Sequence, residues 1–165
     1  MPYTITILLK FKEVTKINSI RKKYDPFYKQ IKPHLTLVYY FDKKPSTESI
    51  NNLIKNVSSF KVRLNKIRAS SKDNYVFLDV TEGKEKLILL KKVLYRRLGL
   101  KWKEKFLYKP HITLANLKTK SEQKQTLKEI KKDNLDFYCK IDSFSLLNIS
   151  KDLITLKSKR EFNLA

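Results

Sequence analysis

The chain has 165 residues, of which 41% are hydrophobic and only 2 are glycine, so it is long enough to bury the core of one domain and has no glycine-rich linker. Its 37 lysines and arginines against 16 aspartates and glutamates give a net charge of +21, which favours a polyanionic partner such as RNA but is also compatible with a merely solvated basic surface. The single cysteine, Cys139, excludes an intrachain disulfide, and because neither a signal peptide nor an apolar span of ~20 residues is present, we expect a cytoplasmic protein that does not cross a membrane.

The first forty residues predict a strand, a helix and a second strand. Side chains alternate between two faces over residues 3–11, as in a strand. Apolar residues recur at helical spacing from Val14 to Tyr24, and this helix should end before Pro26, since a residue preceding proline avoids the α region. The β-rich run 35–41 predicts the second strand.

The next segments predict a helix and two strands. Ser46 or Thr47 can cap a helix whose apolar side reaches Val57. The alternation that starts at Phe60 slips in phase towards Ile67, which indicates a strand with a bulge or bend. Residues 74–81 predict a further strand.

The second half of the chain repeats this alternation of helices and strands. Residues 84–98 predict the strongest helix, ended by Gly99, and 112–117 predict a strand. We expect Ser121 to cap a helix that extends to Ile130. The remainder predicts two strands, 135–149 and 152–160, joined at 150–152. The order β α β α β β α β α β β indicates two related halves within a single domain, 1–165.

One phrase occurs twice and contains both histidines of the chain. Residues 32–37 are Lys-Pro-His-Leu-Thr-Leu and residues 109–114 are Lys-Pro-His-Ile-Thr-Leu. Since residues i and i+2 of a strand share a face, His34 points with Thr36, and His111 points with Thr113. The apolar residues between them should face the helices, so the His/Thr faces should line a more polar cleft between the two halves.

Two imidazoles on one cleft can act as a general acid and a general base. A free imidazole titrates near ~6.5, so at neutral pH one ring can accept a proton while the other donates one. A lone histidine in a strand is usually a packing or hydrogen-bonding residue, but a repeated six-residue phrase that uses every histidine favours a shared site. Other site chemistries fit less well, because a zinc site needs three or four ligands and no glycine-rich phosphate loop is present. A buried thiol explains Cys139 better than a Cys-His nucleophile does.

These features resemble the 2H phosphoesterase superfamily, which includes the RNA 2′,3′-cyclic phosphodiesterases, also called 2′-5′ RNA ligases. The segment RKKYDPFYKQIKPHLTL resembles the small bacterial phosphoesterase branch in particular, and the specific content lies in 21–41 and 106–117. The resemblance implies an α+β, bilobal, duplicated fold in which two antiparallel sheets line a central cleft and helices cover their outer faces. It implies no cofactor and no metal.

The resemblance also implies roles for four residues. His34 would be the proton donor to the leaving oxygen, His111 the proton acceptor that activates water, and Thr36 and Thr113 would bind the phosphate oxygens. Many members have an arginine shortly after the second motif, where this chain has Ala115 and Asn116, so another cation would have to anchor the substrate. The strand alternation also allows Thr4, Thr6, Lys10 and Tyr40 to line the cleft, although a structural role is the simpler explanation for each.

We therefore expect a metal-independent phosphoesterase that hydrolyses 2′,3′-cyclic phosphates, on RNA ends or small cyclic nucleotides, to 2′-phosphomonoesters, with ligation as the reverse reaction. Two alternatives remain open: a non-catalytic RNA-binding protein of the same fold, and a cyclic phosphodiesterase for a non-RNA substrate, such as a cyclic phosphate derived from ADP-ribose. No obligate protein partner is indicated, and we expect a monomer.

Overall fold

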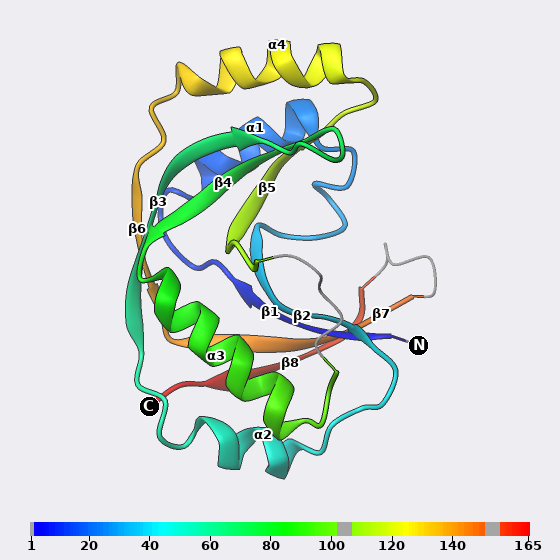
Figure 1. Ribbon diagram of the computed structural model, residues 1–165, viewed down its shortest axis with the longest axis vertical. Coiled ribbons are helices and arrows are strands. Elements are labelled where there is room, and N and C mark those ends of the chain that lie inside the picture. The colour runs from blue at the N-terminus through cyan, green and yellow to red at the C-terminus, as the bar shows by residue number, and fades with distance from the viewer. Residues whose placement is uncertain (1, 102–106, 151–155) are drawn as a thin grey trace.

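The computed structural model describes residues 2–101, 107–150 and 156–165 and contains two four-stranded antiparallel sheets (Figure 1). In spatial order, sheet A contains β2 (His34–Phe41), β1 (Tyr3–Leu8), β7 (Ser143–Ile149) and β8 (Leu156–Asn163). Sheet B contains β5 (His111–Asn116), β4 (Tyr75–Glu82), β3 (Phe60–Ala69) and β6 (Phe137–Ile141). This arrangement confirms the predicted α+β class with two antiparallel sheets.

Two helices cover each sheet. Helices α1 (Val14–Tyr24) and α4 (Lys120–Lys131) pack on sheet B, and α2 (Thr47–Ile54) and α3 (Lys84–Arg97) pack on sheet A (Figure 1). Helix α1 follows a strand of sheet A yet packs against β5, and α3 follows a strand of sheet B yet packs against β2. We call each sheet with the two helices that pack on it a lobe. Each lobe therefore contains one helix that directly follows a strand of the other lobe.

Helix ends were predicted with mixed success. Ser46 caps α2, since its hydroxyl accepts a hydrogen bond from the Ser49 amide at 3.1 Å. Gly99 ends α3 with φ +62°, a conformation that favours glycine. The expected cap of α4 at Ser121 was wrong, because Thr119 is the N-cap and forms a capping box with Glu122.

The predicted strand 135–149 is in fact two strands in different sheets. β6 ends at Ile141, and after Asp142 the chain enters sheet A as β7. The alternation of apolar residues shifts phase between Ile141 and Phe144, but the segment contains no glycine or proline, and this shift alone does not reveal that the chain crosses to the other sheet. The described part of β8 runs from Leu156 to Asn163, three residues beyond the predicted end at 160, whereas the predicted start at 152 and most of the predicted joint at 150–152 lie outside the described residues. β1 ends at Leu8, three residues before the predicted end.

None of the described helices is both long enough and apolar enough to cross a membrane.

Candidate active site

The two motif strands meet where the sheets meet. His34 is the first residue of β2 and His111 is the first residue of β5. Both strands are the edge strands of their sheets, and they contact each other. The charge of His111 lowers the pKa of His34. The fold thus brings together two histidines that are far apart in the sequence.

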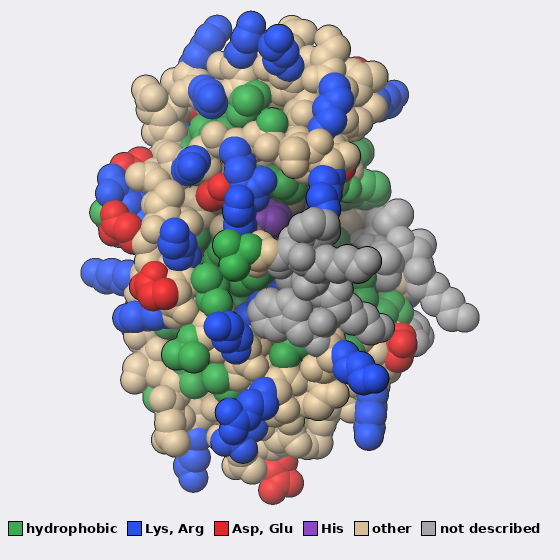
Figure 2. All heavy atoms as spheres, in the orientation of Figure 1, with side chains coloured by type: hydrophobic (Ala, Val, Ile, Leu, Met, Phe, Trp, Pro, Cys, Tyr) green, Lys and Arg blue, Asp and Glu red, His purple; other side chains and the backbone are tan. Residues whose placement is uncertain are grey.

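The side chains of the motifs alternate as predicted. Their apolar residues point into the core and are at most 1% exposed: Leu35, Leu37, Ile112 and Leu114. The histidines and threonines of both motifs are only partly buried. In Figure 2 one histidine side chain is visible near the middle of the face, among Lys and Arg side chains.

Both imidazoles are oriented by the same backbone contact. Nδ1 of His34 lies 2.8 Å from the carbonyl oxygen of Lys32, and Nδ1 of His111 lies 2.7 Å from that of Lys109. A carbonyl can only accept a hydrogen bond, so Nδ1 is the protonated nitrogen in each ring. Nε2 is therefore the nitrogen of each histidine that can accept or donate a proton at a bound substrate.

Burial lowers the pKa of both histidines below the ordinary value, because it disfavours the imidazolium. The carbonyls of Lys32 and Lys109 oppose this effect. Nearby guanidinium groups lower the pKa further, that of Arg21 at His34 and that of Arg68 at His111.

Arg68 is a site residue that the sequence analysis missed. Its Nε donates to Asp79 Oδ2 at 2.6 Å, and its guanidinium lies 4.7 Å from the centre of the Phe77 ring. That ring lies 4.0 Å from the imidazole of His111, centre to centre. The register places Arg68, Phe77 and Thr113 in one row across three strands, with Asp79 directly opposite His111. A guanidinium therefore stands beside the second motif.

Only the phase slip in β3 hinted at this position. Register shifts occur in the pairing of β3 with β4 between Arg63 and Lys66, just before Arg68. The sequence suggested a bulge there but could not say which of the many basic side chains it would turn towards the histidines.

Sheet A presents hydroxyls instead of a cation beside its motif. Thr6 pairs with both Thr36 and Ser145, so these three side chains form a row. Thr6 Oγ1 is buried, and no partner for it is found in the described part of the chain. Leu8 stands opposite His34, at the place that Asp79 occupies opposite His111.

The other cleft candidates differ in their surroundings. The Thr4 hydroxyl donates to the carbonyl of Val38 at 2.6 Å, and Lys10 contacts Ser143 and Glu161, so both are engaged within sheet A. Tyr40 is exposed, and its pKa is raised by burial of the hydroxyl and by Tyr75 of β4.

Tyr108 ties the second motif to the first. Its hydroxyl donates to the carbonyl oxygen of Thr36 at 2.7 Å. Tyr108 lies three residues before His111, so this bond joins the segment leading into β5 to the middle of β2.

Within residues 2–101, 107–150 and 156–165, no three His, Cys, Asp or Glu side chains are grouped so that they could hold a metal ion.

Comparisons with known proteins match this fold and these motifs. The family model described as the 2′-5′ RNA ligase superfamily matches residues 10–153. A protein of Bacillus pumilus (strain SAFR-032) named "Putative phosphoesterase" is 30% identical over 152 residues, which cover 89% of this chain and 88% of that protein. A protein of the same kind from Bacillus licheniformis is 29% identical over 152 residues, with 89% of each chain covered.

Solved structures show the same fold at low sequence identity. The E. coli LigT structure complexed with 3′-AMP has a TM-score of 0.58 and 17% identity, with 100% of this chain and 97% of that chain covered. The LigT structure complexed with NADP+ has a TM-score of 0.61 and 16% identity, with 99% of each chain covered. Kluyveromyces marxianus Usb1 has a TM-score of 0.53 and 11% identity, with 99% of this chain and 98% of that chain covered.

Proposed function

The chain belongs to the 2′-5′ RNA ligase superfamily, and from this membership we propose that it is a metal-independent phosphodiesterase that opens 2′,3′-cyclic phosphates to 2′-phosphomonoesters. The observation that carries the proposal is the pair of partly exposed imidazoles on contacting strands, each held through Nδ1 with Nε2 left for chemistry. The LigT structure with 3′-AMP supports a nucleotide as the substrate class.

The two histidines divide the proton transfers between them. Neutral His111 takes a proton from water through Nε2 as the water oxygen attacks phosphorus. The bond from phosphorus to the 3′ oxygen breaks, and protonated His34 gives its Nε2 proton to that oxygen. The product has a 2′-phosphate and a 3′-hydroxyl, and each histidine ends in the protonation state with which the other began. In the reverse, ligating direction the two histidines exchange roles.

The negative charge on phosphorus is stabilised by nearby donors. Thr36 and Thr113 each lie two residues after a histidine on the same strand face, so their hydroxyls donate to the non-bridging phosphate oxygens. Arg68 supplies the cation that the family often places after the second motif, where this chain has Ala115 and Asn116. A guanidinium can bind two phosphate oxygens at once, which makes it a suitable anchor.

The test is the hydrolysis of 2′,3′-cyclic nucleotides and of short RNAs that end in a cyclic phosphate, with the position of the product phosphate determined. Replacing either histidine, in His34→Ala or His111→Ala, should lower kcat by at least ~10²-fold, because each group contributes about 10²–10⁴ to the rate. Circular dichroism should show an unchanged fold in both variants. Full activity in either variant would reject the two-histidine mechanism.

A pH profile separates the enzyme from a protein that only binds RNA. Since the pKa of both histidines is lowered from 6.5, the bell-shaped profile of kcat/KM should have its maximum on the acidic side of 6.5. A non-catalytic RNA-binding protein would turn over none of the cyclic phosphates at any pH. Hydrolysis of a cyclic phosphate derived from ADP-ribose alone would instead indicate a non-RNA substrate.

A further inference from the structure

A cavity of about 250 Å³ opens beside the first histidine motif. Its walls are the connection between α1 and β2 on one side and sheet A on the other, and in Figure 1 this connection and the adjoining ends of β7 and β8 lie on the same side of the molecule. Leu147, Ile149 and Leu156 form an apolar floor, and Lys29, Lys32 and Lys159 surround it. We call this cavity the lysine-rimmed pocket.

The lysine-rimmed pocket is one strand away from His34. Leu8 lines the pocket and is the residue opposite His34 in the pairing of β1 with β2. Lys32 also lines the pocket, and its carbonyl holds Nδ1 of His34. A molecule whose phosphate sits at the histidine can therefore extend directly into the pocket.

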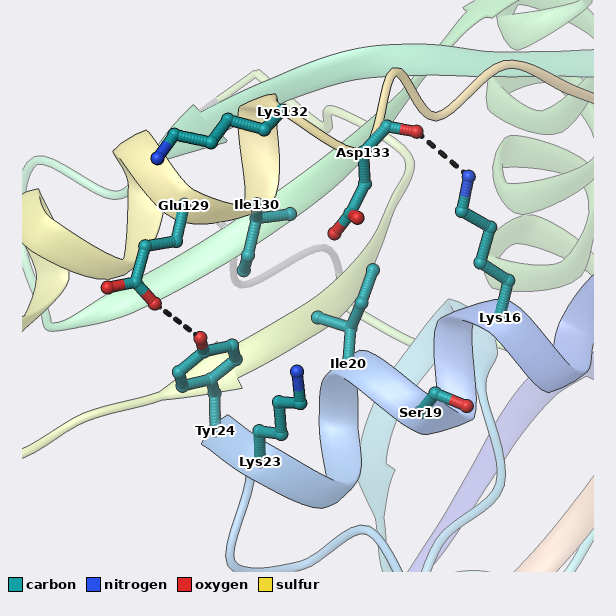
Figure 3. Close-up of a pocket in the computed structure, with 9 residues that line it drawn as sticks. All are labelled: Lys16, Ser19, Ile20, Lys23, Tyr24, Glu129, Ile130, Lys132 and Asp133. Atoms are coloured by element: carbon teal, nitrogen blue, oxygen red, sulfur yellow. Dashed lines mark hydrogen bonds between the residues drawn. The ribbon is translucent and has the colours of Figure 1, made fainter.

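The charge of this pocket differs from that of the other cavities. No aspartate or glutamate lines it, whereas carboxylates line the three other cavities described: Glu129 and Asp133, Asp136, and Asp42. In the cavity between α1 and α4, the walls are tied by hydrogen bonds from Tyr24 to Glu129 and from Lys16 to the Asp133 carbonyl (Figure 3). Lys29 and Lys32 have no carboxylate partner in the described part of the chain, and Lys159 lies 3.7 Å from Glu161. The lysine-rimmed pocket is therefore the one whose charge suits an anion.

We propose that the lysine-rimmed pocket binds the nucleotide that precedes the cyclic-phosphate end of an RNA chain, which makes an oligonucleotide rather than a mononucleotide the preferred substrate. The proposal rests on the phosphodiesterase function given above. The base of that nucleotide lies on the apolar floor, and the lysine ammonium groups contact the phosphates on its 5′ side. Lysine contact with phosphates is a usual component of single-stranded RNA binding, and neither this contact nor burial of a base against aliphatic side chains requires a particular base.

The experiment compares two charge-neutralised variants. Lys29→Gln/Lys159→Gln removes two positive charges from the pocket, and Lys124→Gln/Lys128→Gln removes two from exposed positions of α4. Each protein is assayed with a 2′,3′-cyclic mononucleotide and with a tetranucleotide that ends in a 2′,3′-cyclic phosphate. Binding of a labelled tetranucleotide that ends in a 3′-phosphate is measured by fluorescence anisotropy over a range of salt concentrations.

The pocket variant should bind the tetranucleotide about tenfold more weakly, as expected for two lost lysine–phosphate contacts. The slope of log Kd against log salt should fall by about 1.4, since each contact to a single strand contributes ~0.7. Turnover of the mononucleotide should change by less than about twofold, and the α4 variant should behave as the unchanged protein with both substrates. Leu156→Ala, at a side chain that is already 43% exposed, should also weaken tetranucleotide binding while leaving the fold intact.

Three outcomes would overturn the inference: equal loss in the pocket and α4 variants, equal loss with both substrates, or a preference of the unchanged protein for the mononucleotide. Because anisotropy needs no turnover, failure of the phosphodiesterase function is recognised separately. In that case neither substrate is hydrolysed, and the difference between the two variants in binding still decides whether the pocket holds RNA.

Discussion

The two imidazoles have the same backbone tether but different neighbours. His34 faces Leu8 across the strand pair, and burial is the largest cause that lowers its pKa; the Lys32 carbonyl opposes it, and Arg21, His111 and Asp25 have smaller effects. His111 faces Asp79, whose carboxylate raises its pKa, while Arg68 lowers it. These two opposing charges are bonded to each other. A change in either one should therefore alter the proton affinity of His111 in a known direction.

Arg68→Gln should raise the pKa of His111, because the positive charge that disfavours the imidazolium is removed and Asp79 remains. The acidic limb of the kcat/KM profile should then move to higher pH. Loss of a phosphate anchor should also lower kcat/KM by about tenfold to a hundredfold at the optimum. The measurement is a pH series of initial rates with a cyclic mononucleotide.

Asp79→Asn is the opposing control for Arg68→Gln. Removing the carboxylate takes away the charge that raises the pKa of His111, so the acidic limb should move to lower pH. An Arg68 that does not contact the phosphate predicts the same movement of the limb but a kcat/KM at the optimum within about twofold of the unchanged protein, and that result would refute the anchoring role.

At the residue scale, positions that depend only on local alternation could be predicted from the sequence. His34, Thr36, His111 and Thr113 could be placed on partly exposed faces because each motif is a short run with a period of two. Arg68 could not be placed, because its approach to His111 depends on the irregular register of β3 against β4, which residues more than ten positions apart determine together.

Among the secondary-structure elements, those with a sustained period and clear end signals were predictable. α3 is an example, since leucine spacing defines it and Gly99 ends it. The separation of β6 from β7 was not predicted, because the break at Asp142 is marked in the sequence only by a shift in the alternation, without glycine or proline. The start of α4 was misjudged because the segment offers both a threonine and a serine that could cap it.

Thr119→Ala should lower the free energy of unfolding by about 1 kcal/mol, the usual cost of losing an N-cap. The Thr119 hydroxyl accepts a hydrogen bond from the Glu122 amide at 3.1 Å, and alanine cannot replace it, whereas the bond of 3.2 Å from the backbone amide of residue 119 to the Glu122 carboxylate is retained. Urea unfolding followed by circular dichroism provides the measurement.

Ser121→Ala is the matched control for Thr119→Ala. Ser121 is exposed within the first turn of α4 and is not its cap, so the free energy of unfolding should change by less than about 0.5 kcal/mol. A larger cost for Ser121→Ala than for Thr119→Ala would restore the assignment made from the sequence.

For the whole molecule, the crossing of the chain between the lobes is the dominant feature. The middle of the chain forms sheet B, while its two ends meet in sheet A through the pairing of β1 with β7. Sheet B relies on α1 from the N-terminal segment, and sheet A relies on α3 from the middle segment. Length and composition indicated one domain, but this exchange depends on contacts between remote segments, so no local pattern could predict it.

If one lobe unfolds, the other loses the helix that packs on its sheet, either α1 or α3. We therefore predict that both lobes unfold together in urea. Far-UV circular dichroism reports all elements, and labelling of the Cys139 thiol reports sheet B alone. Cys139 lies in β6, 3% exposed, and burial raises its pKa to about 11, so it should react slowly in the native state. The two signals should have the same midpoint.

The decisive variants are Leu37→Ala in β2 and Leu64→Ala in β3, both at side chains with 0% exposure. Each should cost about 2–5 kcal/mol, as is usual for a leucine truncated in a core. If the exchanged helices couple the lobes, both variants should unfold at a reduced urea concentration, and in each the midpoint of Cys139 labelling should equal the midpoint of circular dichroism. This should hold for Leu37→Ala even though Leu37 lies in sheet A and Cys139 lies in sheet B. If Leu37→Ala lowers the midpoint of circular dichroism but leaves the midpoint of Cys139 labelling unchanged, then the lobes are independent folding units, and the cleft between them is free to open without unfolding either sheet.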